Sequence, residues 1–497
     1  MGAYGTLDFT GWQGGITMGD LRATAEELRK IIEQFIDAGE IKTAKGFLER
    51  WLSVAVAARL QENGIQCSLD DALHTAGLEE DETILAFLTT PTETQDSLRR
   101  FLAYMDQLFQ AKTPSGEHRQ EYQLKLYDDV LLTFWLYVGP FGDVRCVLGH
   151  VSSEARPRLP LDLELSGEGV MNWLRKRVIP KNRAFVNEIL GTFGLNRNNV
   201  KGIIDVCKGL SLNDSYWVVP TGSAGKFSQY NLYENRFSEA LALVAYTGVG
   251  STDAAFTTSP ELTTNGMLPK AWRFLSDDGV YLYKGGTEGA ANAGNEPYAE
   301  YYACQVAEAM GLSAVHYDLE YWKGILASKC KLFTDIDTAF VPIGRIVKNG
   351  GLQACIDYYK AQGEAFYQQL CSMFVFDAVI YNEDRHFGNF GLLRDNHTGK
   401  LIAPAPIFDN GLSLFAHSMP SDWQDMPTYA ATRSNPYEIS YDALCRKVMG
   451  AEQRKQLRRL IGFRFTRHPT INWPEERLLA TEQQLARRVE ALLGMTG

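Results

Sequence analysis

Two short polar segments in the last third of the chain constrain its fold more than any other feature. Residues 382–389 read Asn-Glu-Asp-Arg-His-Phe-Gly-Asn, and residues 409–411 read Asp-Asn-Gly. The largely apolar run before the first segment, residues 373–380, is typical of an element that delivers a loop from the core. Two carboxylates and an amide in such loops are groups that a phosphoryl-transfer site uses to orient a hydroxyl and to hold Mg²⁺. The sequence therefore predicts one site where both segments meet.

The five-residue step from Asp384 to Asn389 has a physical rationale. It is long enough for a loop to turn so that both side chains face one cleft from opposite ends. Protein kinases use the same step, with the aspartate at the acceptor hydroxyl and the asparagine at a metal ion. We therefore expect Asp384 to act on the hydroxyl, and Asn389 and Asp409 to hold metal. A polar loop with an aspartate turn would explain either segment alone, but it explains the ordered pair less well.

A nucleotide-binding lobe is expected upstream of these segments. Residues 274–284 alternate apolar side chains beyond an Asp-Gly turn, which predicts a β-hairpin that ends at Lys284. A lysine in that place can reach nucleotide phosphates as a point charge. Pro297 marks the start of a helix, on which Glu300 shares a face with small apolar residues. An inward carboxylate needs a partner, so we expect it to pair with Lys284; a surface glutamate is the alternative.

Residues 263–270, just before the hairpin, are predicted to form a phosphate-binding loop. They read Thr-Thr-Asn-Gly-Met-Leu-Pro-Lys, and such residues suit a loop whose backbone amides approach phosphate closely. The chain carries no Walker motif, and a single glycine is weaker evidence for phosphate binding than such a motif would be. The candidate nucleotide-binding residues are Thr263, Thr264, Asn265, Gly266 and Lys270.

Residues 329–337 are predicted to form the hinge against which adenine packs. They are a short β-prone run that ends in polar residues, and their order along the chain places them between the two lobes. The candidates for contact with the adenine edge are Phe333, Thr334 and Asp335. An ordinary strand-to-helix connection would explain these residues as well.

The catalytic segment, Asp-Arg-His-x-x-Asn, resembles that of the HipA-like kinases and of the phosphoinositide-kinase branch, since histidine follows the aspartate instead of preceding it. Residues 263–270 resemble the phosphate loop of the HipA family, and residues 300–312 resemble its lobe helix. The resemblance covers roughly residues 260–480 and is patchy before them. It implies an α+β, two-lobed protein-kinase-like fold, here with an extra helical N-terminal region.

The same resemblance implies a serine/threonine kinase that uses ATP and Mg²⁺, acts on a protein, is toxin-like and has an antitoxin-like partner. In that family a residue of the phosphate loop can be autophosphorylated, which expels the loop; Thr263 matches that position and Thr264 is adjacent. His386 is expected to orient Asp384 or a neighbouring backbone carbonyl. Two alternatives remain open: a phosphoinositide-type kinase, and a nucleotide-binding switch that transfers no phosphate.

Length and pattern divide the chain into three parts. At 497 residues it is too long for one domain. Residues 1–112 are predicted to be helical, as a module that could bind a partner, and a linker-like break precedes residue 117. Residues 117–335 are expected to be mixed α/β, with a strand at 161–165, and to end in the nucleotide-binding lobe from about residue 255. Residues 336–497 are expected to form a helical lobe with the catalytic loop.

Composition favours a cytoplasmic enzyme. The net charge of −11 argues against diffuse attraction to nucleic acid or anionic membranes, so we do not expect direct contact with nucleic acid. The eight cysteines stand singly, which fits reduced thiols. No apolar stretch reaches the roughly 18 residues that span a bilayer, and no signal-peptide pattern is present. A basic run at residues 175–183 is expected to be a solvated face, with an anion contact as the alternative, and a polar-aromatic loop at residues 211–217 has no assigned role.

Overall fold

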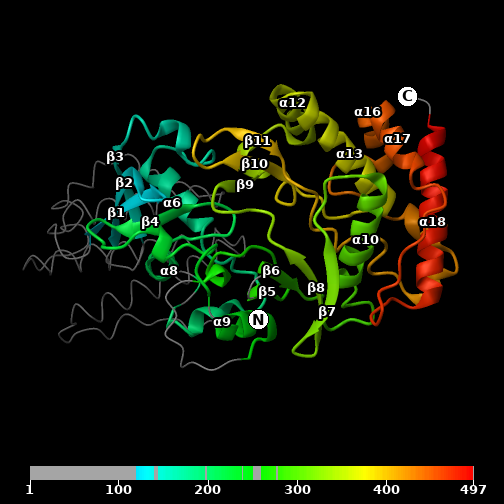
Figure 1. Ribbon diagram of the computed structural model, residues 1–497, viewed down its shortest axis with the longest axis horizontal. Coiled ribbons are helices and arrows are strands. Elements are labelled where there is room, and N and C mark those ends of the chain that lie inside the picture. The colour runs from blue at the N-terminus through cyan, green and yellow to red at the C-terminus, as the bar shows by residue number, and fades with distance from the viewer. Residues whose placement is uncertain are drawn as a thin grey trace, which may run out of the picture. The chain divides into compact units, whose positions relative to one another are not determined.

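The computed structural model describes residues 119–495, apart from 139–143, 196, 198, 238, 250–258, 276 and 277 (Figure 1). The predicted helical region 1–112 and the break before residue 117 lie outside the described residues, as does part of the predicted hairpin turn. Glu121–Trp135 and Cys146–Gly497 belong to one compact unit, which contains the site discussed below. Among the helices that can be described, none combines the length and hydrophobicity that crossing a bilayer requires.

A four-stranded antiparallel sheet forms the first lobe of this unit. Its strand order is β5–β6–β8–β7, with the bounds β5 Lys270–Leu275, β6 Gly279–Lys284, β7 Tyr317–Trp322 and β8 Ile325–Lys331. The β5–β6 pair is the predicted hairpin, and Gly279 after its turn has a φ of 103°, a conformation that glycine adopts without strain. The register of this hairpin places Lys270 opposite Lys284.

The helix α10 (Glu296–Met310) joins this sheet to the second lobe. It packs against β7 and β8 on one side and contacts the second lobe through α13 (Glu364–Ile380) (Figure 1). Pro297 lies in its first turn, as predicted, and Gly311 caps its end with a φ of 74°. Another helix, α9 (Glu239–Thr247), packs against β5. A residue on the inner face of α10 is therefore held against the sheet.

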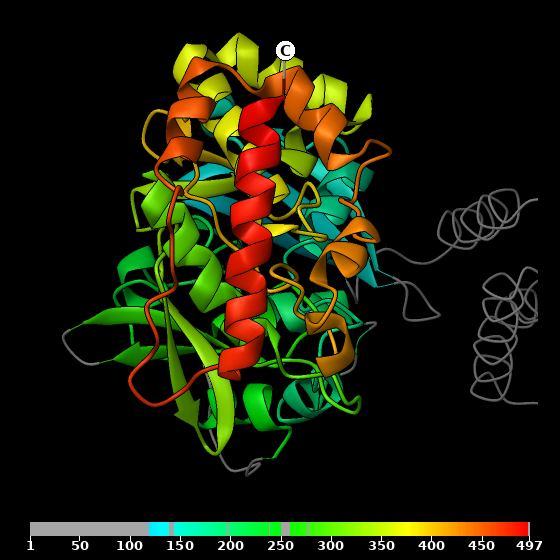
Figure 2. The same cartoon turned by 90° about the vertical axis from the view of Figure 1, so that its right-hand side faces the viewer.

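The second lobe is helical and is built around α13. Residues 370–380 of this helix are buried without interruption, because other helices of the lobe surround it. Figure 2 shows the long α18 running along the outside of this lobe. The predicted apolar run 373–380 is the second half of α13, so the catalytic segment begins where this buried helix ends. The remaining helices are α11 (Ile343–Ile346), α12 (Gly351–Gln362), α14 (Pro420–Trp423), α15 (Met426–Ala431), α16 (Tyr441–Val448), α17 (Ala451–Arg458) and α18 (Glu475–Gly494).

A small antiparallel sheet borders the catalytic segment. Its order is β11–β10–β9, with bounds β9 Thr338–Pro342, β10 Gly391–Asp395 and β11 Leu401–Pro404. The catalytic segment thus runs from the end of α13 to the start of β10, and the second polar segment follows β11. A sheet lobe and a helical lobe in this order form the α+β, two-lobed, protein-kinase-like fold that the sequence predicts.

A mixed α/β region precedes these two lobes. Its sheet has the order β3–β2–β1–β4, with bounds β1 Arg119–Leu126, β2 Asp129–Val138, β3 Val144–Val151 and β4 Tyr216–Pro220. Its helices are α6 (Gly167–Arg175), α7 (Val186–Gly191) and α8 (Val200–Cys207), with short 3₁₀ turns at η2 Arg156–Arg158, η3 Phe227–Gln229 and η4 Pro260–Leu262.

The strand predicted at residues 161–165 is wrong. These residues form a turn and an irregular run that leads to Ser166, whose side chain caps α6 by accepting the N–H of Gly169. The alternating pattern predicts that Asp162 faces solvent. Instead, the side chain of Asp162 turns inward and forms ion pairs with Lys176 and Arg345.

Candidate active site

The predicted partners Lys284 and Glu300 form an ion pair between the sheet and α10. Lys284 is the last residue of β6, and its Nζ donates a hydrogen bond of 2.9 Å to Oε1 of Glu300. Glu300 is fully buried, as the helical spacing predicts for an inward residue. Burial raises the pKa of Glu300, and the charge of Lys284 opposes that shift. The helix therefore fixes the position of the lysine head group.

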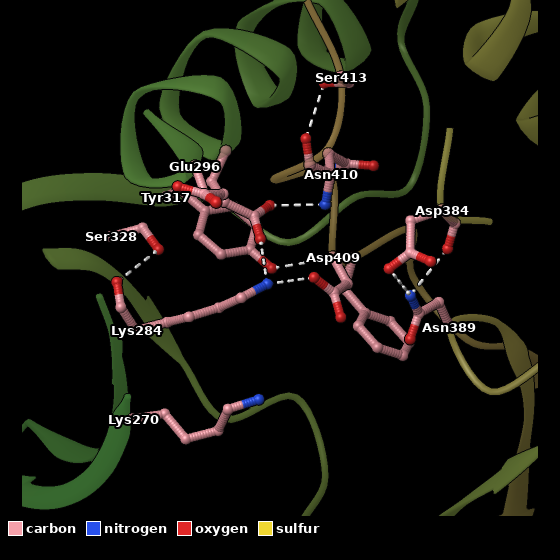
Figure 3. Close-up of polar contacts among 12 residues, drawn as sticks. Lys270, Lys284, Glu296, Tyr317, Ser328, Asp384, Asn389, Asp409, Asn410 and Ser413 are labelled. Carbon is pink, nitrogen blue, oxygen red and sulfur yellow. Dashed lines mark hydrogen bonds and ion pairs between the residues drawn. The ribbon is translucent and has the colours of Figure 1, made fainter. Parts of the chain in front are cut away.

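Glu300 also fixes the segment that carries Asp409. Its second oxygen, Oε2, accepts the backbone N–H of Asn410 at 2.7 Å. Lys284 forms a further ion pair with Asp409, whose backbone N–H donates to the hydroxyl of Tyr317 at 3.1 Å. Figure 3 shows Lys284 reaching from the sheet toward Asp409, with Asn410 beside it in the second polar segment. One buried carboxylate thus joins three parts of the chain that are far apart in sequence.

Asp409 is a charged carboxylate at neutral pH, in a backbone conformation that its neighbours impose. Its φ of 57° is left-handed, which costs a non-glycine residue about 1–3 kcal/mol. Burial alone would raise the pKa of Asp409, but the charges of Lys284 and Lys270 hold it well below its usual range. Such an oxygen ligand fits Mg²⁺, which proteins usually hold through one or two carboxylates together with substrate phosphates. Within the described residues, no group of three or more His, Cys, Asp or Glu could hold a metal alone.

Asp384 and Asn389 are joined within the loop that follows α13. The Nδ2 of Asn389 donates to the backbone oxygen of Asp384 at 2.9 Å and to its Oδ2 at 3.5 Å. The N–H of Asp384 donates to Oδ1 of Asn382 at 3.0 Å. Burial raises the pKa of Asp384, and the negative charge of Asp409 adds to the rise. Figure 3 shows Asp409 between Lys284 and this pair, so the structure brings the predicted residues together.

His386 lies in the same loop and is exposed. Its Nδ1 accepts the N–H of Gly388 at 2.9 Å, and its backbone N–H donates to the carbonyl of Asp384 at 2.8 Å. Among the described residues, no hydrogen bond joins the imidazole ring of His386 to the carboxylate of Asp384. Its charge opposes the effect of burial on the pKa of Asp384. A role for the side chain of His386 in orienting Asp384 therefore stays a prediction.

Arg385 organises the site, although the sequence reading assigned it no role. Its side chain is 1% exposed and lies where the catalytic loop, α13 and the second polar segment meet. It contacts the carboxylate of Asp377 (3.0 Å), the carbonyls of Asn389 (2.9 Å) and Phe408 (2.5 Å), and Oδ1 of Asn410 (2.5 Å). The last two residues flank Asp409, so one guanidinium ties both flanks to the catalytic loop. The sequence held one signal for this role: Asp377 lies in the otherwise apolar run 373–380, and a buried carboxylate needs a cation nearby.

The predicted phosphate loop is anchored at its start. The hydroxyls of Thr263 and Thr264 both donate to the carbonyl of Pro260, at 3.2 and 2.6 Å. A buried ion pair of 2.5 Å between Arg183 and Glu261 holds the preceding residues, and Arg183 also donates to the carbonyl that begins β5. The tip of the loop, residues 265–267, is exposed. The loop therefore has a fixed base and an open tip.

Lys270 is the second cation of the site. Its Nζ donates to the carbonyl of Asn265 at 2.9 Å. Gly266 between them has a φ of 93°, a conformation that favours glycine, and a Cβ there would force the Nζ of Lys270 to shift. Burial lowers the pKa of Lys270 to about 7, and the charge of Lys284 contributes to the shift. Figure 3 shows both lysine head groups extending in the same direction from the sheet, an arrangement that an added anion would stabilise.

The predicted hinge residues lie beside the site. The side chains of Phe333 and Thr334 contact other parts of this protein. The ring of Phe333 packs 5.3 Å from that of Phe408, the residue before Asp409. The hydroxyl of Thr334 donates to the carbonyl of Leu212 at 2.5 Å. The N–H of Asp335 donates to the carbonyl of Thr338, so this amide is engaged within the turn that leads to β9. Contact of these residues with adenine stays a prediction.

We expect Lys284→Ala to weaken ATP binding and to reduce stability by about 1–3 kcal/mol, because it leaves a buried carboxylate without its cation. Protonation of Glu300, whose pKa burial already raises, limits the loss. The double variant Lys284→Met, Glu300→Gln removes both charges and keeps an acceptor for Asn410, so it should regain stability but not activity. Calorimetric titration with ATP and thermal unfolding measure the two effects. Unchanged ATP affinity in Lys284→Ala would contradict the assignment of the lobe.

Sequence comparison finds a relative with a named activity. No family model matches the chain. The serine/threonine-protein kinase CtkA of Helicobacter pylori is 28% identical over 137 residues, which cover 24% of this chain and 41% of that protein. The chain thus spans less than half the length of this curated relative. The predicted resemblance to the HipA-like kinases is confirmed, at modest identity.

Two solved structures show similarity to parts of the chain. The proinflammatory kinase CtkA of Helicobacter pylori matches with 19% identity and a TM-score of 0.38, over 46% of this chain and 91% of that chain. HipA of Shewanella oneidensis MR-1, solved as a toxin–antitoxin complex with HipB and operator DNA, matches with 12% identity and a TM-score of 0.44. That match covers 76% of this chain and 100% of the matched chain of that complex.

Proposed function

We propose that this protein is a kinase that uses ATP and Mg²⁺ to phosphorylate a serine or threonine hydroxyl of a protein. One observation carries the proposal: Lys284 contacts both Glu300 and Asp409, beside the joined pair Asp384 and Asn389. Groups for the phosphates, the metal and the acceptor are thus available in one place, which is the requirement for phosphoryl transfer. Similarity to a named serine/threonine kinase supports it.

Each role in this proposal follows from the environment of a residue. Asp384 would position the acceptor hydroxyl and take its proton, and its raised pKa makes it a stronger base than an exposed carboxylate. Asn389 and Asp409 would hold Mg²⁺, which when bound offsets the charge of the phosphates. Lys284, fixed by Glu300, would bind phosphate oxygens, and Lys270 would add a second cation.

Incubation with labelled ATP and two kinds of acceptor, protein and phosphoinositide vesicles, tests the proposal. Label on serine or threonine of a protein is expected. Label on phosphoinositide vesicles, with none on protein, would favour the phosphoinositide-type kinase instead. Magnesium-dependent ATP binding without transfer to any acceptor would favour the nucleotide-binding switch.

We further propose that the protein acts in the cytoplasm and binds a regulatory partner of the antitoxin kind. Composition and the singly placed cysteines motivate the first statement, and the resemblance to the HipA-like kinases motivates the second. The helical region predicted at residues 1–112 is the candidate for partner binding. Direct contact with nucleic acid is not part of the proposal, given the net charge of −11.

Autophosphorylation at Thr263 or Thr264 is expected to lower ATP affinity. Both hydroxyls are engaged with Pro260 and Thr263 is buried, so the loop must leave its place before either can be modified. A phosphate adds about −1.5 to −2 charges, which would repel nucleotide phosphates and hold the loop away. Mass spectrometry after expression, and again after dephosphorylation and fresh ATP, locates the modification; Asp384→Asn is the inactive control. Phosphate found at other residues alone would reject this mechanism.

A further inference from the structure

The peptide bond between Phe408 and Asp409 is held at both ends by parts of the chain that are distant in sequence. Its carbonyl, which belongs to Phe408, accepts a hydrogen bond of 2.5 Å from Nη1 of Arg385 in the catalytic loop. Its N–H, which belongs to Asp409, donates to the hydroxyl of Tyr317 at 3.1 Å (Figure 3). Tyr317 is the first residue of β7, so the helical lobe holds one end of this peptide and the sheet lobe holds the other.

The hydroxyl of Tyr317 takes the place of a backbone acceptor. The chain before Asp409 runs parallel to the segment that leads into β7, through an isolated β-bridge at Ile407. Ile407 donates its N–H to the carbonyl of Ser313 at 2.9 Å and accepts the N–H of Val315 at 2.8 Å. A continued parallel ladder would bring the N–H of Asp409 to the carbonyl of Val315. That N–H goes to the Tyr317 hydroxyl instead, so one side-chain atom fixes the peptide where the pairing ends.

Two fixed peptide planes determine the direction in which the side chain of Asp409 leaves the backbone. Arg385 and Tyr317 hold the plane before its Cα, and Glu300 holds the plane after it by accepting the next N–H at 2.7 Å. The φ between these planes is 57°, which the backbone of a non-glycine residue does not favour by itself. The arrangement that turns this carboxylate to Lys284 is therefore strained, and it relaxes when one plane is free to pivot.

The surroundings of the Tyr317 hydroxyl make it hard to replace. The residue is 4% exposed, and its ring packs with Cys304, Val315 and Cys330 in a small cluster of the core. Burial raises the pKa of this hydroxyl well above its usual value, so it stays neutral and can accept the N–H of Asp409. Without the hydroxyl, that N–H would be a buried donor with no acceptor, which costs more free energy than the bond itself contributes.

We propose that Tyr317 is a positioning residue for metal binding: its hydroxyl holds the peptide before Asp409 and so keeps the carboxylate of Asp409 in the orientation that binds Mg²⁺. The inference rests on the proposed function. It extends the control of the metal site from the helical lobe to the sheet that is proposed to bind nucleotide. The affinity for Mg²⁺ would then depend on a residue that supplies no ligand atom.

The test removes a single oxygen atom, with Tyr317→Phe in the full-length protein. The concentration of Mg²⁺ for half-maximal transfer should rise about two- to ten-fold, whereas calorimetric ATP affinity without Mg²⁺ should stay unchanged. In the metal-free protein, hydrogen exchange at the amide of Asp409 should become faster. Tyr302→Phe is the matched control, because that tyrosine is also fully buried and its hydroxyl donates to Asn472 at 2.7 Å; it should change none of these quantities.

An unchanged Mg²⁺ requirement in Tyr317→Phe, or an equal shift in Tyr302→Phe, would overturn the inference and leave the kinase proposal intact. Absence of both transfer and Mg²⁺-dependent ATP binding in the wild type would overturn the proposed function as well. A double variant, Tyr317→Phe with Arg385→Lys, tests the shared peptide. Since both residues hold it, the shift in Mg²⁺ requirement should be smaller than the product of the separate shifts. Shifts that multiply would show independent action and would also overturn the inference.

Discussion

Asp409→Asn is expected to abolish phosphoryl transfer, and Asp384→Asn to reduce it by about 10²- to 10⁴-fold. The two losses have different causes. Asp409 is held as a charged carboxylate by Lys284 and Lys270, and the amide that replaces it keeps the shape but loses the charge that would hold Mg²⁺. Asp384 is joined to Asn389 and has a raised pKa, so its amide could still contact the acceptor but could not take a proton.

Nucleotide binding distinguishes the two variants. Asp384→Asn should bind ATP with its dependence on Mg²⁺ unchanged, whereas Asp409→Asn should lose that dependence. Transfer of label from ATP, calorimetric titration with and without Mg²⁺, and thermal unfolding together measure these outcomes. Asp357→Asn, the same change at an exposed position of α12, is the control and should resemble the wild type. Labelling at the wild-type rate by either site variant would remove that residue from the site.

The parts of the site that local pattern could predict are those with a fixed period or a short spacing. Helical spacing placed Glu300 on a buried face, and the alternation of the hairpin placed Lys284 at the end of a strand that faces it. The five-residue step joined Asp384 to Asn389. In each case the geometry depends on the spacing of a few neighbouring residues, so it can be predicted without knowledge of tertiary contacts.

The parts that escaped prediction depend on tertiary contacts. The left-handed backbone of Asp409 is imposed by Glu300, Tyr317 and Arg385, which come from distant segments. Residues 161–165 alternate like a strand, but they form a turn and an irregular run in which Asp162 is buried and paired with Lys176 and Arg345. Local propensity is a weak prior where buried charges must find partners.

Arg385→Ala is expected to cost about 3–5 kcal/mol of stability and to remove most activity. The change leaves Asp377 as a buried carboxylate without its cation, which is the expensive way to break such a pair. It also frees both flanks of Asp409 and the carbonyl of Asn389, so the two residues proposed to hold metal lose their common anchor. Unfolding in urea measures the first effect, and labelled ATP measures the second.

Arg385→Lys separates positioning from folding. Lysine keeps the charge beside Asp377, but one ammonium group cannot replace a planar guanidinium at four separate acceptors. We therefore expect much of the stability to return while kcat stays low and more Mg²⁺ is needed for half-maximal activity. The matched control is Arg394→Lys, since Arg394 is also buried and bonded to backbone carbonyls, yet it lies at β10 away from Asp409. That variant should lose stability without a change in the Mg²⁺ requirement. An equal shift of the Mg²⁺ requirement in both variants would show that Arg385 acts through general stability, because Arg385 contacts both flanks of Asp409 and Arg394 contacts neither.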